Sequence, residues 1–228
     1  DRQGNDIGTR YRTGIYWLDN DDMQIVEEVY EEIQNGYDSP LMVEKCRLDC
    51  FFPAEEYHQD YLLKNPSGYC HLSPAELRFA KTYANITKAL RSYADEEKKI
   101  VLSRFFKTGK GEYGEGDRFI GVIVPNTRKV AREHAGVSWE VIEALLESEW
   151  HECRLCALLI LVERYRKYPE ETVRFYLEHT KGISNWDLVD LSAPYILGRY
   201  LTGSENRTIL YTLAGSDNMW EQRIAVVS

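Results

Sequence analysis

The stretch Ser184-Asn185-Trp186-Asp187-Leu188-Val189-Asp190-Leu191 places a tryptophan and a carboxylate four residues apart in a helical pattern. Because residues four apart share one face of an α-helix, Trp186 and Asp190 should point in the same direction. Trp150 and Trp220 lie 36 residues before and 34 residues after Trp186, and each also opens a predicted helix. Such a period is typical of helical solenoids, whose inner helices line a concave surface. Tryptophans that fill the core between stacked helices would have the same spacing, so both interpretations stay open.

Helical patterns account for almost all of the chain after residue 85. Glycines and prolines mark most of the joints between the predicted helices. These helices span Ile86–Phe106, Pro125–His134, Ser138–Glu147, His151–Lys167, Glu170–His179, Trp186–Tyr200, Glu205–Ala214 and Asn218 onward. We therefore expect an all-α superhelix of helical repeats over residues 86–228.

Residues 1–85 have a mixed pattern. Two aromatic and β-branched runs, Tyr11–Trp17 and Leu41–Phe51, predict strands, and Asp19–Gln34 between them predicts an amphipathic helix. A second helix is expected to start at Pro53 and to run to about Leu63. The fold class that follows is an α+β fragment (1–85) and then the all-α repeat (86–228), with α-helix predominant overall.

Acidic residues are concentrated in the first third of the chain. Residues 1–85 hold 8 Lys and Arg against 16 Asp and Glu, whereas residues 86–228 hold 20 against 21. The net charge of −9 therefore does not exclude a nucleic-acid partner for the helical part. Cations that would form a positive stripe there are Lys107, Lys110, Arg118, Arg128, Lys129, Arg132, Arg154 and Arg199. The longest apolar run, Leu155–Val162, has only eight residues, far fewer than the roughly 20 that span a bilayer.

The five cysteines are odd in number and unevenly spaced, which does not fit a framework of paired disulfides. We therefore expect a reducing compartment, the cytoplasm. Cys46 and Cys50, even with His58 or His71, match no closed zinc pattern, so we expect no metal site. The C-x-x-C at residues 153–156 lies inside a predicted helix, where buried thiols that pack as small hydrophobes are favoured over redox chemistry.

Three ordered motifs mark residues 1–85. They are Arg2-Gln3-Gly4-Asn5-Asp6-Ile7-Gly8-Thr9-Arg10-Tyr11-Arg12, Phe52-Pro53-Ala54-Glu55-Glu56-Tyr57-His58-Gln59-Asp60-Tyr61 and Asn65-Pro66-Ser67-Gly68-Tyr69-Cys70. In this order they resemble the C-terminal half of the MsrA-type peptide methionine sulfoxide reductases. The resemblance implies that Asp6 and Tyr11 bind the substrate and that Cys70 is the resolving cysteine, which forms a disulfide with the oxidised nucleophile. It also implies thioredoxin as reductant and oxidised methionine in proteins as substrate.

The nucleophile motif of that family, Gly-Cys-Phe-Trp, does not occur in the sequence. Its cysteine attacks the sulfoxide sulfur, so without it the reaction lacks its first step. We therefore expect no reduction of methionine sulfoxide by this chain alone, and turnover of such a substrate with thioredoxin would contradict that expectation. Since the sequence starts at Asp1 without an initiator methionine, we expect it to be a piece of a longer polypeptide.

Three motifs of the helical part resemble the AlkD-type DNA alkylation repair glycosylases. They are the Gly-rich turn into a helix at Gly121–Arg128, the stretch Ser184–Leu191 and the stretch Asp217–Arg223. The resemblance covers residues 86–228 and implies a HEAT-like superhelix that cradles double-stranded DNA. It implies removal of positively charged N3- or N7-alkylated purines by cleavage of the N-glycosidic bond. The family's fold continues for further helices, so we expect this domain to be truncated at its C-terminus.

Position by position, Trp186 matches the family's aromatic residue, Asp190 its catalytic carboxylate and Arg223 its DNA-binding arginine. We also expect Trp220 and Arg154 to contact DNA. The residue types suit the chemistry, because an alkylated purine is already cationic and the enzyme has only to stabilise the sugar. An ionised carboxylate stabilises the nascent oxocarbenium ion, an indole attracts the cationic lesion by about 0.5–2 kcal/mol, and an arginine binds phosphate.

A second hypothesis assigns the helical part to a different class. In it the parent polypeptide is chiefly a methionine sulfoxide reductase, and residues 86–228 are a non-catalytic module that binds DNA or protein. For Asp190 the corresponding alternative is a salt bridge within or between helices, and for Trp186 it is core packing. Release of a free alkylated base from duplex DNA separates the two hypotheses.

Overall fold

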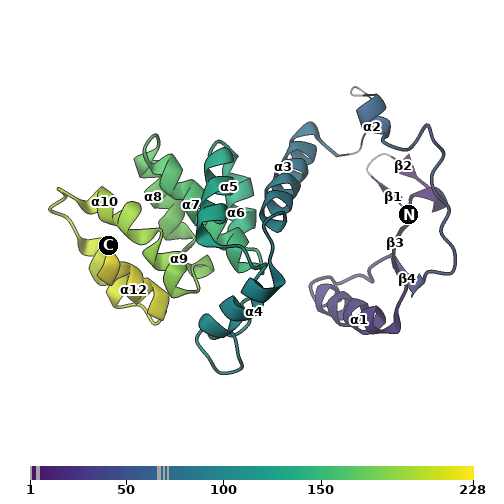
Figure 1. Ribbon diagram of the computed structural model, residues 1–228. Coiled ribbons are helices and arrows are strands. Elements are labelled where there is room, and N and C mark those ends of the chain that lie inside the picture. The colour runs from purple at the N-terminus through teal and green to yellow at the C-terminus, as the bar shows by residue number, and fades with distance from the viewer. Residues whose placement is uncertain (1, 4–5, 66–67, 69, 71) are drawn as a thin grey trace. The chain divides into compact units, whose positions relative to one another are not determined.

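The computed structural model describes residues 2–3, 6–65, 68, 70 and 72–228 (Figure 1). The chain divides into two compact units, Asp1–Ser73 and Pro74–Ser228. An α+β segment is followed by helices, which confirms the predicted fold class. The boundary between the two parts, predicted after residue 85, instead lies between residues 73 and 74 in the structure. Residue 85 lies inside helix α3 (Pro74–Arg91), and the whole of α3 belongs to the second unit because it packs on later helices.

The described part of the first unit holds two small sheets, two α-helices and one 3-10 helix. Their bounds are β1 (Arg2–Gln3), β2 (Asp6–Ile7), η1 (Thr9–Tyr11), β3 (Thr13–Trp17), α1 (Asn20–Gln34), β4 (Val43–Arg47) and α2 (Tyr61–Lys64). β1 and β2 pair antiparallel, whereas β3 and β4 pair in parallel, with Thr13 opposite Val43 and Trp17 opposite Arg47. A parallel pair needs a crossover connection, which α1 provides. The two predicted strands and the helix between them are thus confirmed.

The helix predicted from Pro53 is wrong for most of its length. Residues 56–60 form turns, and only Tyr61–Lys64 are helical. Asp60, just before α2, has a left-handed backbone (φ 53°), which interrupts a helix. Every described residue from 51 to 61 is exposed, so an amphipathic helix here has nothing to pack on and is too short to be stable alone.

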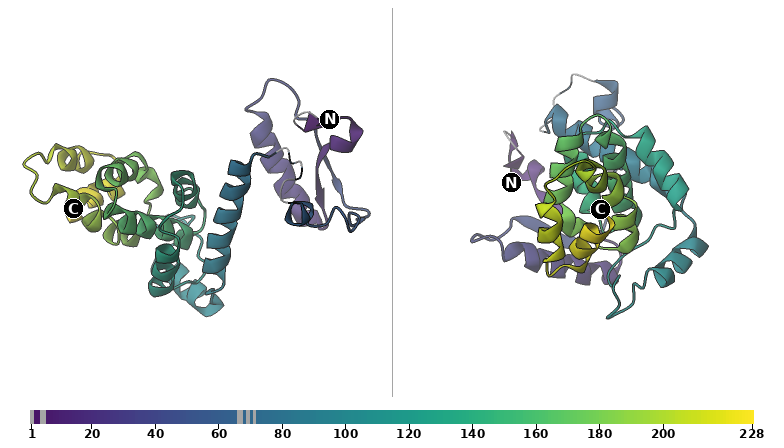
Figure 2. Two further views of the ribbon diagram at one scale, coloured as in Figure 1. Left: turned by 90° about the horizontal axis from the view of Figure 1, so that it is seen from above. Right: turned by 90° about the vertical axis from the view of Figure 1, so that its left-hand side faces the viewer.

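Helices form the second unit, one after another along the chain (Figure 1 and the left view of Figure 2). After α3 they are α4 (Glu96–Phe105), α5 (Val124–Glu133), α6 (Trp139–Leu146), α7 (His151–Tyr165), α8 (Pro169–Glu178), η2 (Thr180–Gly182), α9 (Trp186–Asp190), η3 (Ala193–Tyr195), α10 (Leu197–Leu201), α11 (Thr208–Ala214) and α12 (Met219–Val227). In the described part of the chain, no helix combines the length and apolar character needed to cross a membrane.

Helix α7 is the centre of the second unit. All residues from His151 to Leu161 are buried, and α5, α6 and α8 pack on this helix. The sequence shows why, since residues 155–162 are apolar on every side and a helix of that kind must be covered on all faces. The polar exceptions, His151, Glu152 and Arg154, are buried with it and therefore need partners inside the protein.

Two predicted helices are each broken into shorter ones. Ile86–Phe106 is not continuous, because α3 ends at Arg91 and the side chain of Asp95 caps α4 by accepting a hydrogen bond from the Lys98 N–H (3.0 Å). The predicted helix from Trp186 to Tyr200 is divided into α9, η3 and α10. Pro194 lies in η3 and lacks the N–H that a continuous helix would use.

Candidate active site

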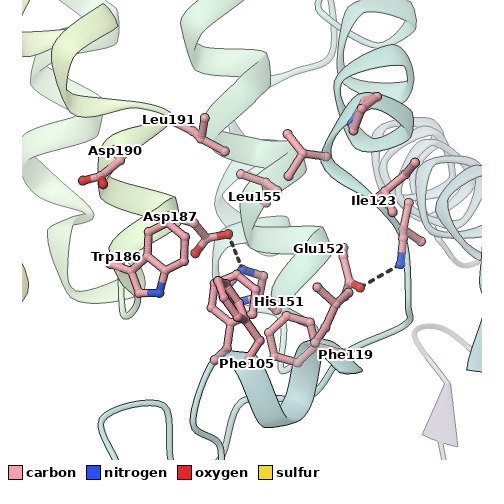
Figure 3. A pocket seen from close by; sticks show the side chains of 15 residues that line it. Phe105, Phe119, Ile123, His151, Glu152, Leu155, Trp186, Asp187, Asp190 and Leu191 are labelled. Atoms are coloured by element: carbon pink, nitrogen blue, oxygen red, sulfur yellow. Dashed lines mark hydrogen bonds and ion pairs between the residues drawn. The ribbon is translucent and has the colours of Figure 1, made fainter. Parts of the chain in front are cut away.

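A pocket of about 390 Å³ lies where α4, α7, α9 and the start of α5 meet. Its walls are mostly aromatic and aliphatic, and carboxylates come from α7 and α9. The lining side chains are those of Leu102, Phe105, Phe106, Phe119, Val122, Ile123, Val124, Pro125, His151, Glu152, Leu155, Trp186, Asp187, Asp190 and Leu191. Figure 3 shows Trp186, Asp187 and Asp190 on one side and Ile123 on the opposite side. The predicted pair Trp186 and Asp190 therefore share one cavity.

Asp190 is held by Arg223 of α12. The Nε and Nη2 groups of Arg223 donate to the two carboxylate oxygens of Asp190 at 2.8 and 2.7 Å, a forked pair that fixes both side chains. The Arg223 side chain is 41% exposed and that of Asp190 is 35% exposed. The hydrogen bond to Asp190 raises the pKa of Arg223, so the arginine stays charged. This is the salt bridge between helices that the second hypothesis expects for Asp190, and because the carboxylate stays partly exposed, its catalytic role stays a prediction.

Trp186 belongs to a cluster of stacked rings at the pocket wall. Its indole stacks on Phe106 (centroids 5.3 Å apart, planes at 19°) and meets the edge of Phe105 at 5.9 Å. Phe106 continues the stack to Phe119 (5.1 Å), which in turn stacks on His151 (4.5 Å). The indole is half-buried, so one part of it packs and the rest faces the pocket.

Beneath these rings lies a buried polar network centred on His151. Its Nδ1 is 3.0 Å from a carboxylate oxygen of Asp117, and its Nε2 is 2.9 Å from one of Asp187. Arg154 pairs with the other oxygen of Asp117, and Asn185 donates to Asp117 at 3.0 Å. Burial by itself would raise the pKa of Asp117, but the His151 hydrogen bond and the Arg154 charge outweigh it and lower that pKa. The carboxylate therefore stays ionised.

Glu152 fixes the segment that forms the opposite wall. Its carboxylate, only 1% exposed, accepts hydrogen bonds from the backbone N–H groups of Ile120 (2.8 Å), Gly121 (2.8 Å) and Val122 (3.0 Å). Gly121 has φ of +93°, and a Cβ there would lie 2.1 Å from the Asp95 carbonyl oxygen, so the chain requires glycine. The Gly-rich turn found in the sequence is thus a backbone loop held by one buried carboxylate.

The structure corrects the role that we predicted for Arg154. Its side chain is 8% exposed, paired with Asp117 and donating to the Ser148 carbonyl oxygen at 2.7 Å. A guanidinium buried in this way has no free surface for a DNA phosphate. In the sequence, its place between Cys153 and Leu155, near the start of a helix that is otherwise apolar, is the signal that it is structural.

The other tryptophans of the repeat pack against the core rather than in the pocket. Trp150 and Trp220 are both half-buried against the hydrophobic cluster of the second unit. The Arg91 guanidinium lies over the Trp150 ring at 5.0 Å, and Trp220 meets the edge of Tyr113 at 6.1 Å. Trp220 does not line the pocket, so contact between DNA and this residue stays a prediction.

Comparison with protein families divides the chain at residues 86–89, inside α3 and close to the boundary predicted from the sequence. A model described as DNA alkylation repair enzyme matches residues 86–228, which is more than half of the sequence. The chain belongs to the DNA alkylation repair enzyme family. A second model, peptide methionine sulfoxide reductase, matches residues 1–89, so the reductase-like segment comes first and the DNA alkylation repair domain follows.

Curated peptide methionine sulfoxide reductases match the N-terminal part of the chain. The peptide methionine sulfoxide reductase MsrA of Mycoplasma pneumoniae is 55% identical over 71 residues, which are 31% of this chain and 45% of that protein. The MsrA of Clostridium acetobutylicum is 53% identical over 76 residues, 33% of this chain and 46% of that protein. The chain thus spans less than half the length of these relatives. No solved structure matches the chain significantly.

In the reductase-like segment, two of the predicted site residues lie on neighbouring elements. Asp6 is in β2 and Tyr11 ends η1, which contacts β2, and both side chains are half-buried. Cys70 is a free, half-buried thiol. Gly4 and Asn5 of the first motif and Pro66, Ser67 and Tyr69 of the third lie outside the described residues. The roles of Asp6, Tyr11 and Cys70 stay predictions.

The described residues contain no group of three or more His, Cys, Asp or Glu side chains arranged to hold a metal ion. Cys46 in β4 and Cys50 beyond it are exposed free thiols. His58 bonds instead to Glu55, with 3.2 Å between its Nδ1 and the carboxylate. His71, the other ligand that we considered with these cysteines, lies outside the described part of the chain.

The five thiols should differ sharply in reactivity. Cys153 and Cys156 are 1% and 0% exposed, as expected for small core residues, and burial raises the pKa of Cys153 to about 11 and that of Cys156 further. A rise of two pKa units lowers the thiolate fraction about 100-fold. Titration with Ellman's reagent should therefore modify Cys46, Cys50 and Cys70 quickly and the other two at least about 100-fold more slowly. Equal rates for all five in the folded protein would contradict this, and all five should react alike in guanidinium.

Sequence reasoning missed the buried part of the site. The DNA alkylation repair domain uses Asp117, His151, Asp187 and Glu152 to support the pocket, and none of them was predicted. One signal was available, because residues 151 and 152 and Arg154 are polar at the start of a helix that is otherwise apolar on all faces. Polar groups in such a helix are buried with partners, which the sequence cannot name.

Proposed function

We propose that residues 86–228 bind double-stranded DNA and cleave the N-glycosidic bond of N3- or N7-alkylated purines. One observation carries the proposal: the Trp186 indole and the partly exposed Asp190 carboxylate, which a forked arginine orients, line one aromatic pocket. This places a negative charge next to rings that attract a cationic, planar lesion. The family supports DNA as the substrate, and the lesion class and the excision chemistry are the proposed steps.

The pair between Asp190 and Arg223 is compatible with catalysis. A carboxylate offers about four lone-pair directions, and Arg223 uses two of them, so Asp190 can still face a cationic sugar. A guanidinium has five N–H groups, of which three remain for phosphate oxygens. Arg223 would then hold the DNA backbone and the acid at once, and Asp190 would stabilise the oxocarbenium ion until water captures it.

The test is the release of 7-methylguanine or 7-methyladenine from a methylated DNA duplex. Free base produced in proportion to the protein supports excision. Duplex binding without release would favour the second hypothesis, a non-catalytic DNA- or protein-binding module in a polypeptide that is chiefly a reductase. None of the eight predicted stripe cations lines the pocket, so their contribution is measured through DNA binding rather than base release. Binding is best measured at several salt concentrations, because phosphate contacts cause a steep loss of affinity as salt rises.

For residues 1–85 we propose the C-terminal half of an MsrA-type reductase. The identity to MsrA proteins over about 70 residues supports this assignment, with Asp6 and Tyr11 in the substrate pocket and Cys70 as resolving cysteine. Thioredoxin and oxidised methionine in proteins would be partners of a complete reductase. This chain holds no Gly-Cys-Phe-Trp nucleophile, so incubation with a methionine sulfoxide peptide, thioredoxin, thioredoxin reductase and NADPH should give no turnover.

Two further proposals concern architecture and location. The ordered packing of successive helices and the tryptophan period of 34–36 residues favour a HEAT-like superhelix for the DNA alkylation repair domain. Five free thiols favour a reducing compartment, and we propose the cytoplasm.

A further inference from the structure

The buried network under the pocket contains two carboxylates that both bind one imidazole. The side chains of Asp117, Asp187, Arg154 and His151 are 8%, 6%, 8% and 2% exposed. A neutral imidazole carries one N–H, so it can donate to only one of two carboxylates and would turn a lone pair toward the other. Contacts of 3.0 and 2.9 Å to both ring nitrogens therefore require both to be protonated.

Charge balance leads to the same protonation state. With His151 charged, two carboxylates face two cations, whereas a neutral His151 would leave one unpaired buried negative charge, which is costly. Burial opposes the charged imidazole, but the hydrogen bonds to Asp117 and Asp187 and their charges outweigh it, so the pKa of His151 lies above its ordinary value of 6.5. Among the residues that the structure describes, no other charged group is hydrogen-bonded to the ring. The Phe106 and Phe119 rings pack against it, and the Glu152 carboxylate turns toward residues 120–122.

The network holds Trp186 through both of its neighbours in the chain. Asn185 donates from its amide to Asp117 (3.0 Å) and accepts from the Trp186 N–H at 2.8 Å. On the other side, Asp187 binds His151 through one oxygen and caps the Leu188 N–H with the other at 2.9 Å. Trp186 and Asp187 begin the five-residue helix α9, and Asp190 is its last residue. Figure 3 shows the contact between Asp187 and His151 beside the Trp186 indole.

We propose that His151 is a positioning residue that carries a permanent positive charge and fixes α9, and with it Trp186 and Asp190, against the pocket. The inference rests on the proposed function for its effect on catalysis, but the protonation and the placement of Trp186 are properties of the free protein. His151 touches no DNA in this scheme. Its two ring nitrogens join the carboxylates of Asp117 and Asp187, which come from different parts of the chain, and we call this pair of contacts the clamp.

The first measurement needs no variant and no activity. In the whole protein labelled with 15N-histidine, the His151 ring should be protonated on both nitrogens at about pH 7.5, where an unperturbed imidazole is roughly nine-tenths neutral. His151→Gln identifies its signals. A singly protonated ring at that pH would overturn the proposal, whether or not the protein releases bases.

The second measurement follows Trp186 by 19F NMR of protein labelled with 5-fluorotryptophan, assigned with Trp186→Phe. In His151→Gln the Trp186 resonance should shift or broaden, and kcat for base release should fall about 10-fold with KM within about twofold. Asp187→Asn keeps the shape of the side chain but removes its charge, so the variant stabilises the charged imidazole of His151 less. As pH rises, the kcat of this variant should therefore begin to fall at a lower pH than the kcat of the original chain. His179→Gln is the matched control, because His179 lies outside the network: its ring contacts the half-exposed Glu143 and both the carbonyl oxygen and the ring of Phe175. This variant should change neither quantity.

The outcomes separate the two proposals. If the original chain releases no base while His151 is doubly protonated and Trp186 moves in His151→Gln, the excision proposal fails and the positioning inference stands. If Trp186 and kcat are unchanged in His151→Gln, the inference is overturned. Should that variant not fold, the protonation state and the pH profile of Asp187→Asn decide instead, and a profile identical to that of the original chain would refute the clamp.

Discussion

Replacing Glu152 by alanine should destabilise the helical unit by at least about 3 kcal/mol, because three buried backbone N–H groups lose a charged acceptor. Hydrogen bonds to charged groups contribute about 1.5–3 kcal/mol each, and a buried donor without an acceptor costs its desolvation in full. Glu152→Gln keeps one oxygen but turns an NH2 group toward at least one of these donors, so it should cost about 1–3 kcal/mol.

The measurement is urea denaturation followed by far-UV circular dichroism, since most helices belong to this unit. Glu149→Gln is the matched control. Glu149 lies three residues earlier and pairs with Arg118 at the surface, where both side chains are more than half exposed, so its loss should cost at most about 1 kcal/mol. A Glu152→Ala protein as stable as the control variant would show that the loop of residues 120–122 holds its shape without the carboxylate.

The sequence was most informative where local signals are strong. The caps and breakers that delimit α5 to α8 are local, and these helices begin and end within two residues of the predicted bounds. The i,i+4 spacing of Trp186 and Asp190 also predicted their shared pocket correctly, because it depends only on helix geometry. The C-x-x-C motif was interpreted correctly as core for the same reason, since it lies in a helix with apolar residues on every side.

Features that depend on long-range contacts could not be predicted. The clamp joins Asp117, His151 and Asp187, which are 34 and 36 residues apart, and no local pattern pairs them. Arg154 was predicted to bind DNA because a positive charge looks the same in sequence whether it faces solvent or a buried carboxylate. The helix expected from Pro53 failed for the opposite reason, because its local signals were favourable and nothing packs on it.

Asp190→Asn should abolish most base release while leaving DNA binding nearly intact. The amide has almost the shape of the carboxylate but no charge, so the oxocarbenium ion loses its electrostatic stabilisation and kcat should fall roughly 10²–10³-fold. KM should change little, because phosphate contacts are made by other residues. The measurement is single-turnover release of 7-methylguanine, with fluorescence anisotropy for duplex affinity and Asp217→Asn, an exposed aspartate of the same unit, as control.

Arg223→Ala distinguishes catalysis by Asp190 from a purely structural salt bridge. If Asp190 serves only to orient Arg223, Asp190→Asn and Arg223→Ala lose the same contact. Both variants should then bind the duplex more weakly and release base from bound DNA at an unchanged rate. If Asp190 acts on the sugar, Asp190→Asn lowers the rate on bound DNA, whereas Arg223→Ala mainly lowers affinity and its salt dependence. Neither change should cost more than about 1 kcal/mol of stability, because the pair is partly exposed. Identical profiles for the two variants would therefore leave Asp190 as an anchor for Arg223 and would refute excision by this carboxylate.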